Sequence, residues 1–418
     1  MFSFLTRVTT AYSPIRITPD PVTPPEHTAA LALCALKKQQ PAPLPPLIKD
    51  PNALPAIFQI TQGELQIQCR ILKILGEGGH GRVFSVLCQS IGGEEQQYAM
   101  KVSLASFNAE ETKANKIELY YEALYLKKIT SQDRLDQYFL GRWALDAAIS
   151  PSHYMLLQKQ YGPDLSKLSR RTPGGLDLSQ IQSLTTQALT ALAFLQEHGI
   201  THGDFKPANL LLDENQIRLI DFGTAFDTPD PNDGPQPAYM CSRFWRAPEI
   251  ILGLPLDHTI DIWSLGCSIF ELFTGSYLFP SENAARHRLM LGLFLSPFPL
   301  RYIQRLRPQI QLLFTSSADG IFTMKPEPFP DLKSPREFLD TQFTSRKSRC
   351  SEIEQDSCEL LKDFIESTLA LENRPSATDL LQHPFIKHTI LVSPSTAMRA
   401  VDHARPSIEQ TEDLYEGD

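Results

Sequence analysis

The sequence predicts an α+β fold in which strands come first and helices follow. Short apolar runs between about residues 71 and 102 flank a glycine-rich segment and have the β-branched and aromatic content of strands. Further along, apolar residues recur at helical spacing, as in the stripe of Leu184, Ala188, Leu192 and Leu195, which we expect in the core. We therefore expect a small β-rich part followed by a larger helical part.

Composition divides the chain into one large globular unit and two flanking segments. The 418 residues include 33 prolines, which crowd the stretch from 14 to 55. A Pro-rich segment with few periodic apolar residues cannot bury enough surface to offset the entropy of ordering, so we expect residues 1–60 to be disordered. Residues 389–418 are expected to form a disordered acidic tail.

Charge and cysteine usage limit the classes of partner. The formal net charge of −9 argues against nucleic acid or an anionic membrane as the main partner. The seven cysteines form no C-x-x-C pair, so we expect reduced thiols and no metal site built from them. We expect no membrane association, and residence in the nucleus or cytoplasm. Residues 1–19 weakly resemble a mitochondrial transit peptide, but Pro14 and Pro19 interrupt any amphipathic helix.

The glycine-rich segment Gly76-Glu77-Gly78-Gly79-His80-Gly81 lies between two predicted strands. Glycines leave the backbone bare, so it can approach a phosphate group closely. The same spacing before a helix would indicate a dinucleotide site, but Arg-Val-Phe-Ser-Val-Leu follows here and is typical of a strand. The next strand ends in Tyr98-Ala99-Met100-Lys101-Val102, and a helix is predicted over about 114–129, with Glu118 and Glu122 one turn apart.

Two polar motifs follow the predicted helix that contains Leu184. The first is His202-Gly203-Asp204-Phe205-Lys206-Pro207-Ala208-Asn209, and the second is Asp221-Phe222-Gly223. A carboxylate on a rigid loop can accept a proton from an incoming hydroxyl, and amide and carboxylate oxygens suit a hard cation such as Mg²⁺. Later segments contain Ala247-Pro248-Glu249, Asp261-Ile262-Trp263-Ser264-Leu265-Gly266 and Asn373-Arg374-Pro375.

In this order and spacing, the motifs resemble those of eukaryotic protein kinases. The resemblance implies a bilobal protein-kinase fold over about residues 70–388, with a β-rich N-lobe at about 70–160 and an α-helical C-lobe at about 161–388. It implies ATP and Mg²⁺ as cofactors and protein substrates phosphorylated on Ser or Thr. It also implies that Asp261 accepts backbone N–H groups of the catalytic loop and that Glu249 pairs with Arg374.

The resemblance assigns roles to individual residues. Asp204 is expected to act as the base, Lys206 to neutralise the transferred phosphoryl group, and Asn209 and Asp221 to hold Mg²⁺. Lys101 is expected to bind the α- and β-phosphates. The family pattern of a Glu followed by an apolar residue four positions on favours Glu122 as its partner, which leaves Glu118 as a solvated helix position. The expected nucleotide contacts are Gly76, Glu77, Gly78, Gly79, His80, Gly81, Val83, Ala99, Lys101, Gln158, Lys159 and Tyr161.

Within the kinases, the chain is most similar to the CMGC group. The similarity is carried by Ser242-Arg243-Phe244-Trp245-Arg246 before Ala-Pro-Glu and by a long insert at about 279–358. The branch it most resembles holds the spliceosomal pre-mRNA-processing kinases, the dual-specificity tyrosine-regulated kinases and the homeodomain-interacting kinases. A regulatory or scaffold partner is expected at the insert. Two hinge residues depart from the family, because Gln158 replaces an apolar gatekeeper and Lys159 replaces an acidic residue.

A glycine at position 203 bears on regulation. Most kinases carry Arg there, and that Arg binds a phosphorylated activation loop, which Gly203 cannot do. Tyr239 is the only hydroxyl residue between Thr228 and Ser242, so we expect it to be autophosphorylated and to pair with Arg243 and Arg246. The alternative is that Tyr239 packs in the fold while the two arginines pair with carboxylates such as Glu249.

Two other functions remain open from the sequence. A pseudokinase acting as a scaffold or allosteric partner would have the fold without the chemistry. Against it, all six polar residues that such proteins lose are present: Lys101, Glu122, Asp204, Lys206, Asn209 and Asp221. A small-molecule kinase of similar fold is disfavoured by the Ala-Pro-Glu segment and the long C-lobe.

Overall fold

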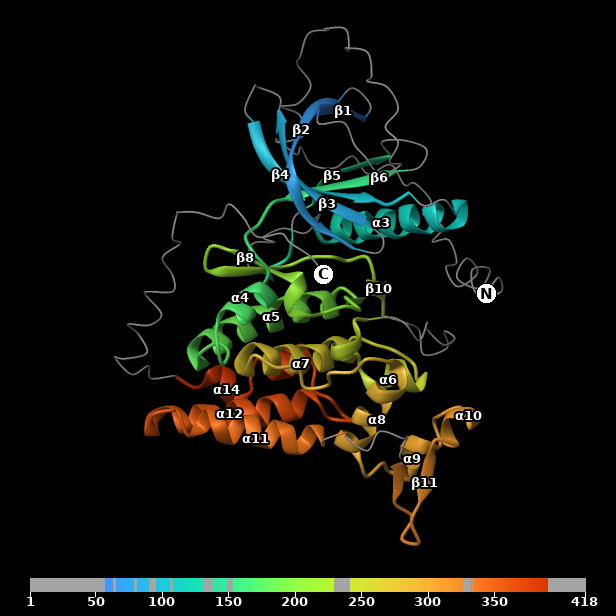
Figure 1. The fold of residues 1–418 in the computed structure, drawn as a ribbon, viewed down its shortest axis with the longest axis vertical. Coiled ribbons are helices and arrows are strands. Elements are labelled where there is room, and N and C mark those ends of the chain that lie inside the picture. The colour runs from blue at the N-terminus through green and yellow to red at the C-terminus, as the bar shows by residue number, and fades with distance from the viewer. Residues whose placement is uncertain are drawn as a thin grey trace.

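The computed structural model describes residues 57–62, 65–78, 81–89, 95–105, 108–130, 138–141, 143–148, 153–228, 241–325, 332 and 334–389. A sheet-containing lobe lies above a larger helical lobe (Figure 1), which confirms the predicted bilobal α+β fold. The expected acidic tail lies outside the described residues apart from position 389, as does the expected disordered N-terminal segment apart from 57–60.

The small lobe is built on one antiparallel sheet of six strands in the order β1-β2-β3-β4-β6-β5. Alternate residues face a small apolar core that includes Ile67, Cys69, Val86 and Met100. The strands are β1 (Ile57–Gln62), β2 (Leu65–Glu77), β3 (Gly81–Gln89), β4 (Glu95–Ser103), β5 (Trp143–Ala148) and β6 (Tyr154–Lys159).

Strand β1 differs from the expectation of disorder up to residue 60. Its residues pair along β2 from Ile57 opposite Arg70 to Gln62 opposite Leu65, and the Ile60 side chain is buried. The first part of β2 has the apolar alternation Leu65, Ile67 and Cys69, which gives β1 a regular partner with one buried face. The ordered sheet therefore begins before the expected start of the domain.

Helix α3 (Ala109–Thr130) packs against β4, β5 and β6 and is longer than the predicted 114–129. Glu110 and Glu111 occupy its first turn and Lys127 and Lys128 its last, so both ends are complemented by charge. The acidic first turn lies outside the predicted range and favours the earlier start of the helix. Its buried residues include Leu119, Glu122, Ala123, Leu126 and Ile129, and the four apolar ones belong to the core that continues into the helical lobe.

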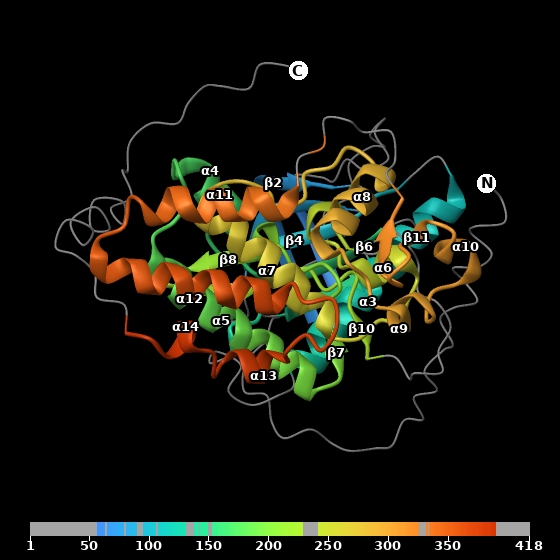
Figure 2. The same ribbon diagram turned by 90° about the horizontal axis from the view of Figure 1, so that it is seen from below.

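The helical lobe is assembled around α7 (Thr259–Thr274), in which every residue from Ile260 to Thr274 is buried. Helices α5 (Leu178–Glu197) and α12 (Glu352–Thr368) pack against it (Figure 2). At Gly266 an added Cβ would lie 2.0 Å from the Thr368 hydroxyl oxygen, so only glycine allows this close approach of α7 and α12. On α5, the predicted stripe is confirmed as core, with Ala188, Leu192 and Leu195 buried and Leu184 packed against them.

The other helices of this lobe are α4 (Leu165–Arg171), α6 (Pro248–Leu252), α8 (Ala284–Leu295), α9 (Leu300–Ile303), α10 (Pro308–Gln311), α11 (Pro335–Lys347), α13 (Ala377–Leu380) and α14 (Pro384–Lys387). Three small antiparallel pairs join β7 (Ile200–Thr201) to β10 (Phe226–Asp227), β8 (Leu210–Asp213) to β9 (Gln216–Leu219), and β11 (Phe314–Ser316) to β12 (Phe322–Met324). Helices α8 to α11 and the β11–β12 hairpin fall in the predicted insert at 279–358.

The expected contact of Glu249 with Arg374 is present, at 2.9 Å between Oε1 and Nη2. Arg374 also donates to the carbonyls of Thr259 and Ala370, and its guanidinium lies 5.2 Å from the centre of the Trp263 ring. The pair thus joins α6 to α7 and to the chain after α12. Among the described residues, none of the helices has an apolar stretch sufficient to cross a lipid bilayer.

Candidate active site

The loop that carries Asp204 is held from below by α7. Both Asp261 carboxylate oxygens accept backbone N–H groups, from His202 at 2.7 Å and from Gly203 at 3.0 Å. Burial raises the pKa of Asp261, whereas the N–H groups and His202 favour its charged form. The sequence predicted this contact, and it fixes the backbone directly before Asp204.

Gly203 has a φ of +78°, in the left-handed region that side chains rarely adopt. A Cβ added here would lie 2.6 Å from the Thr224 carbonyl oxygen, closer than real Cβ atoms approach. Glycine therefore relieves both the backbone strain and the close approach of the segment after Asp221.

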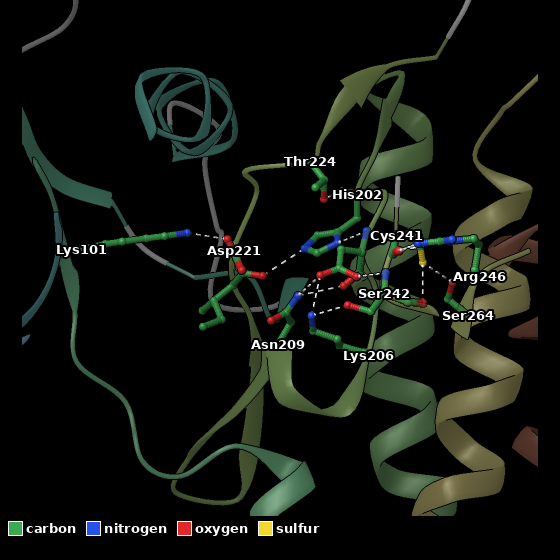
Figure 3. A network of polar contacts seen from close by, with 12 residues as sticks. Lys101, His202, Lys206, Asn209, Asp221, Thr224, Cys241, Ser242, Arg246 and Ser264 are labelled. Carbon is green, nitrogen blue, oxygen red and sulfur yellow. Dashed lines mark hydrogen bonds and ion pairs between the residues drawn. The ribbon is translucent and has the colours of Figure 1, made fainter. Parts of the chain in front are cut away.

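Lys206, Asn209 and Ser242 belong to one polar network (Figure 3), and all three contact Asp204. The Asp204 Oδ1 accepts the Ser242 backbone N–H at 2.7 Å, and its Oδ2 lies 2.6 Å from Lys206 Nζ. Lys206 Nζ also donates to Ser242 Oγ at 2.6 Å. The Asn209 amide nitrogen donates to the Asp204 carbonyl at 2.8 Å, which leaves its amide oxygen as an acceptor. Ser242 was part of a sequence motif, but nothing in the sequence indicated that it would contact both Asp204 and Lys206.

Lys101 of β4 reaches into the same region and bridges two carboxylates. Its Nζ lies 2.7 Å from Glu122 Oε2 on α3 and 2.7 Å from Asp221 Oδ1. Burial disfavours the ammonium, but the two carboxylates outweigh this and raise the pKa of Lys101. Burial raises the pKa of the Glu122 carboxyl to about 7, against the pull of Lys101.

The pKa of Asp221 shifts in the opposite direction to that of Glu122. Although burial opposes its ionisation, the charge and hydrogen bond of Lys101 lower the pKa of Asp221. Its side chain is 38% exposed and keeps a second carboxylate oxygen. This carboxylate therefore stays ionised at neutral pH, as a metal ligand requires.

Glu118 is not the solvated position that we expected. It is half-buried, its carboxylate oxygen lies 3.4 Å from the point where a Gly223 Cβ would be, and its charge contributes to the raised pKa of Glu122. Helical spacing brings Glu118 and Glu122 onto the same face, and the contact with Lys101 belongs to Glu122.

The two glutamates give a paired test. We expect Glu122→Gln to lower phosphoryl transfer by about 10²-fold, because the neutral amide no longer fixes the Lys101 ammonium. Glu118→Gln, one turn away on the same helix, is the matched control and should stay within a few-fold of the wild type. Steady-state kinetics with a peptide substrate checks both variants, and a larger loss in Glu118→Gln would show that the assignment to Glu122 is wrong.

The described part of the glycine-rich segment lies beside Lys101, since a Cβ added on Gly81 would be 3.5 Å from the Lys101 Cε. The Gly78 N–H donates to the Gly81 carbonyl at 2.9 Å, and an added Cβ on Gly81 would lie 3.1 Å from the Val102 carbonyl. Val83 pairs with Lys101 across β3 and β4. Gly76 and Glu77 end β2, and Arg82 binds Glu77 at 2.8 Å. The predicted contacts Gly79 and His80 lie outside the described residues.

The predicted gatekeeper and hinge begin at the end of β6, which includes Gln158 and Lys159. Gln158 is buried opposite Ala99, and its amide nitrogen lies 3.5 Å from the second Glu122 oxygen. Lys159 reaches Asp213 on β8 at 3.3 Å and lies 5.3 Å from the centre of the Tyr161 ring. Gln158 and Lys159, the two residues that differ from the expected hinge pattern, thus connect the hinge to α3 and to the helical lobe.

A polar contact near the hinge was missed from the sequence. Ser85 on β3 donates to the Gln160 amide oxygen at 2.8 Å and accepts from Gln97 on β4 at 2.9 Å. No local pattern predicts such a contact, because its members are far apart in sequence and their residue types are common on surfaces.

Arg243 and Arg246 both bind backbone carbonyls. Arg243 donates to the carbonyls of Ser281 and Glu282, at 3.2 and 2.6 Å, and Arg246 donates to Cys241 at 2.7 Å. Cys241 has a φ of +67°, so the buried Arg246 guanidinium holds a strained residue directly before Ser242. Tyr239 lies outside the described residues, and Glu249 is engaged by Arg374 instead.

The residues present fit a magnesium nucleotide. Asn209 and Asp221 lie at the two ends of the β8–β9 hairpin, where the Ile220 N–H donates to the Asn209 carbonyl at 3.0 Å. They offer one amide oxygen and one carboxylate. In the described part of the chain, no three His, Cys, Asp or Glu side chains form a closed metal site. Mg²⁺ ordinarily takes one or two protein oxygens together with phosphates and water, so this donor set suits it.

Comparison with known proteins gives a consistent picture. The protein family described as "Protein kinase domain" matches residues 69–386 of the chain. A serine/threonine-protein kinase, prpf4B of Dictyostelium discoideum, is 32% identical over 55% of this chain and 28% of its own length. The dual specificity protein kinase YAK1 of Saccharomyces cerevisiae is 34% identical over 51% of this chain and 25% of its own length.

A longer match is the dual specificity protein kinase lkh1 of Schizosaccharomyces pombe, which is 27% identical over 82% of this chain and 52% of its own length. The chain therefore spans about a quarter to a half of these relatives. Among solved structures, the crystal structure of a kinase domain is similar with a TM-score of 0.60 and 26% identity. The match covers 76% of this chain and 95% of that one.

Proposed function

The chain belongs to the protein kinase family, and from that premise we propose that it is an active protein kinase that uses ATP and Mg²⁺ to phosphorylate Ser or Thr residues of protein substrates. The observation that carries the proposal is the double contact of Lys101, at 2.7 Å from both Glu122 and Asp221. A binding protein with the fold alone has no need to hold a partly buried ammonium between two carboxylates.

The relatives support the predicted branch of the protein kinases. The prpf4B and YAK1 kinases, and the DYRK-family kinase pom1 of Schizosaccharomyces pombe, carry the names of the branches that the sequence resembles, so that resemblance is confirmed. Protein substrates, the predicted partner of the insert at 279–358 and residence in the nucleus or cytoplasm remain proposals by analogy with this family.

Each side chain has a part in the proposed transfer. Asp204, fixed by Ser242, would orient the substrate hydroxyl and accept its proton. Lys206, 2.6 Å away, would screen the charge on the moving phosphoryl group. Lys101 would hold the α- and β-phosphates, and Asn209 and Asp221 would supply oxygen ligands. Mg²⁺, when bound, would neutralise negative charge on the phosphates.

The test is direct. Purified protein is incubated with labelled ATP, Mg²⁺ and a degenerate peptide array, and phosphosites are mapped on the array and on the enzyme. We expect transfer to Ser or Thr peptides with a turnover on the order of 1–100 per second on a good substrate. Binding of Mg·ATP without transfer to any peptide would favour the pseudokinase alternative.

We further propose that phosphorylation of Tyr239 by the enzyme itself activates it. Gly203 offers no side chain to bind a phosphorylated activation loop, whereas Arg243 and Arg246 lie within seven residues of Tyr239 in the sequence. Both arginines already bind carbonyls. A guanidinium has five N–H donors, and those of the exposed Arg243 beyond its carbonyl bonds could reach a phosphate. A phosphotyrosine carries about −1.5 to −2 charges and could make one to three such bonds.

Mass spectrometry of protein expressed in bacteria, which mostly lack tyrosine kinases, tests this mechanism. We expect phosphate on Tyr239 of the wild type and none on an Asp204→Asn variant. Tyr239→Phe should lower activity toward peptides, because the surface before Ser242 loses its charged anchor. A fully active wild type with unmodified Tyr239, or an unimpaired Tyr239→Phe, would instead support a packing role for this residue.

A further inference from the structure

Two pairs of thiols lie in contact in the described part of the chain. Cys69 and Cys88 form one pair, in the small lobe, and Cys350 and Cys358 form the other, at the start of α12. None of these four is in a disulfide, and none belongs to the proposed active site. Because the pairs have the same composition, differences between them come from their surroundings.

The pair in the small lobe is buried. Cys69 and Cys88 are direct partners across β2 and β3, and their exposed fractions are 0% and 2%. The contact with Cys88, together with burial, raises the pKa of Cys69 far above its usual value. Buried thiols in apolar surroundings remain protonated and react slowly.

The pair at α12 is placed differently. Cys350 is half-buried and directly precedes Ser351, the N-cap of the 17-residue helix α12, whereas Cys358 is buried two turns further on. Cys350 therefore lies at the positive end of a helix dipole. Its sulfur contacts Cys358 and lies 3.4 Å from the Arg346 carbonyl at the end of α11.

The contacts of Cys350 make its thiol more acidic than an ordinary cysteine. A hydrogen bond from Cys358 lowers the pKa of Cys350 to about 7, burial and Glu354 oppose this, and the charge of Arg346 assists it. Donating that hydrogen bond, together with burial, raises the pKa of Cys358. The contact thus gives a nucleophilic sulfur in reach of solvent and a protonated thiol beside it, which is the arrangement of a reactive and a resolving cysteine.

We propose that Cys350 and Cys358 are a redox modification site that closes to a reversible disulfide when the protein meets a peroxide. The Cys350 thiolate attacks one peroxide oxygen, the O–O bond breaks, and the leaving hydroxide takes a proton to become water. Cys350 is then a sulfenic acid. The Cys358 sulfur attacks the Cys350 sulfur, the S–O bond breaks, and the departing hydroxide takes the Cys358 proton. Two thiols are oxidised to one disulfide and one hydrogen peroxide is reduced to two waters.

The disulfide would bear on the packing of the helical lobe. Arg346, one helical turn before Cys350, donates to the carbonyls of Gly174 and Leu176 between α4 and α5, and its guanidinium lies 4.3 Å from the centre of the Phe273 ring on α7. A link from Cys350 to Cys358 would tie the turn after Arg346 to α12. It would therefore restrain the segment from which Arg346 reaches α7.

The experiment uses the full, reduced chain at pH 7 with a small excess of hydrogen peroxide. Free thiols are then alkylated, and the protein is digested with a protease that cleaves after glutamate, since Glu352 and Glu354 lie between the two cysteines. We expect a linked pair of peptides containing Cys350 and Cys358, lost again after treatment with dithiothreitol. Cys69 and Cys88, measured in the same digest, are the matched control and should oxidise at least about tenfold more slowly.

A variant separates the two chemical steps. In Cys358→Ser the second step is blocked, so a sulfenic acid should accumulate on Cys350 and be trapped by dimedone, whereas Cys350→Ser should show no trapped product at Cys358. The wild-type digest decides the matter even if a variant does not fold. Absence of the linked peptides, with Cys350 recovered as a free thiol or overoxidised, would overturn the proposal, as would equal oxidation of Cys69 and Cys88.

Discussion

Asp221→Asn is expected to lower phosphoryl transfer by about 10³-fold or more while leaving the fold intact. Asp221 has a φ of +66°, and asparagine tolerates this left-handed backbone better than most residues, so the substitution keeps the local conformation. What changes is charge. Lys101 loses one of its two ionic partners, and the proposed Mg²⁺ site loses its only carboxylate.

A matched control exists six residues further on. Asp227 on β10 also pairs with a lysine, since its carboxylate lies 2.9 Å from Lys128 Nζ, but both side chains are about half exposed. An exposed pair of this kind contributes about 0–1 kcal/mol, so Asp227→Asn should retain near-normal activity.

Single-turnover transfer and thermal unfolding, measured on Asp221→Asn and Asp227→Asn in parallel, separate chemistry from stability. We expect unchanged unfolding midpoints and a large loss of transfer in Asp221→Asn alone. If Asp221→Asn kept more than about a tenth of the wild-type rate, Asp221 could not be the principal metal ligand, since loss of one well-placed electrostatic group costs about 10²–10³-fold.

The sequence predicted those parts of the candidate site for which the expected chemistry admits only a few residue types. A phosphate-binding lysine, a metal-binding carboxylate and a base each admit few residue types, so the motifs around Lys101, Asp204 and Asp221 are visible without a structure. The choice of Glu122 over Glu118 came from the family pattern, and the structure brings Glu122 to Lys101.

Helical periodicity alone did not separate the two glutamates. Residues four apart lie on one face, and Glu118 is half-buried beside Gly223 on that same face. Which of the two meets Lys101 depends on how α3 lies across the sheet. That placement is set by contacts of α3 with β4, β5 and β6, which are distant in sequence.

Other features depended on long-range packing that no local pattern contains. Ser242 binds Asp204 although the two residues are 38 positions apart in the sequence, a separation that no local pattern spans. In contrast, the strand that pairs with β1 had a local signal that went unused, since Leu65, Ile67 and Cys69 of β2 alternate with polar residues in the sequence. The neighbouring prolines favoured disorder, but pairing with β2 and burial of Ile60 prevailed.

Asp204→Asn is expected to lower the rate of transfer by about 10³-fold with little change in the KM for ATP, because a base of this kind contributes about 10²–10⁴-fold. The amide oxygen can still accept the Ser242 N–H, which now lies 2.7 Å from Oδ1, so the loop should keep its position. The amide nitrogen then replaces Oδ2, the atom 2.6 Å from Lys206, and a nitrogen that carries two hydrogens cannot accept a proton from a substrate.

The measurement is kcat and KM for ATP and for a peptide substrate, with Lys206→Met as a comparison. Both variants alter the same polar network, but only Asp204→Asn removes the group that accepts the proton, so its loss of kcat should be the larger of the two. The contacts of Lys101 with Glu122 and Asp221 are unaltered in both variants, and ATP affinity should therefore be preserved. A tenfold rise in the KM for ATP with kcat retained would show that Asp204 organises the nucleotide site instead, and the role of base would then have to be assigned to another residue.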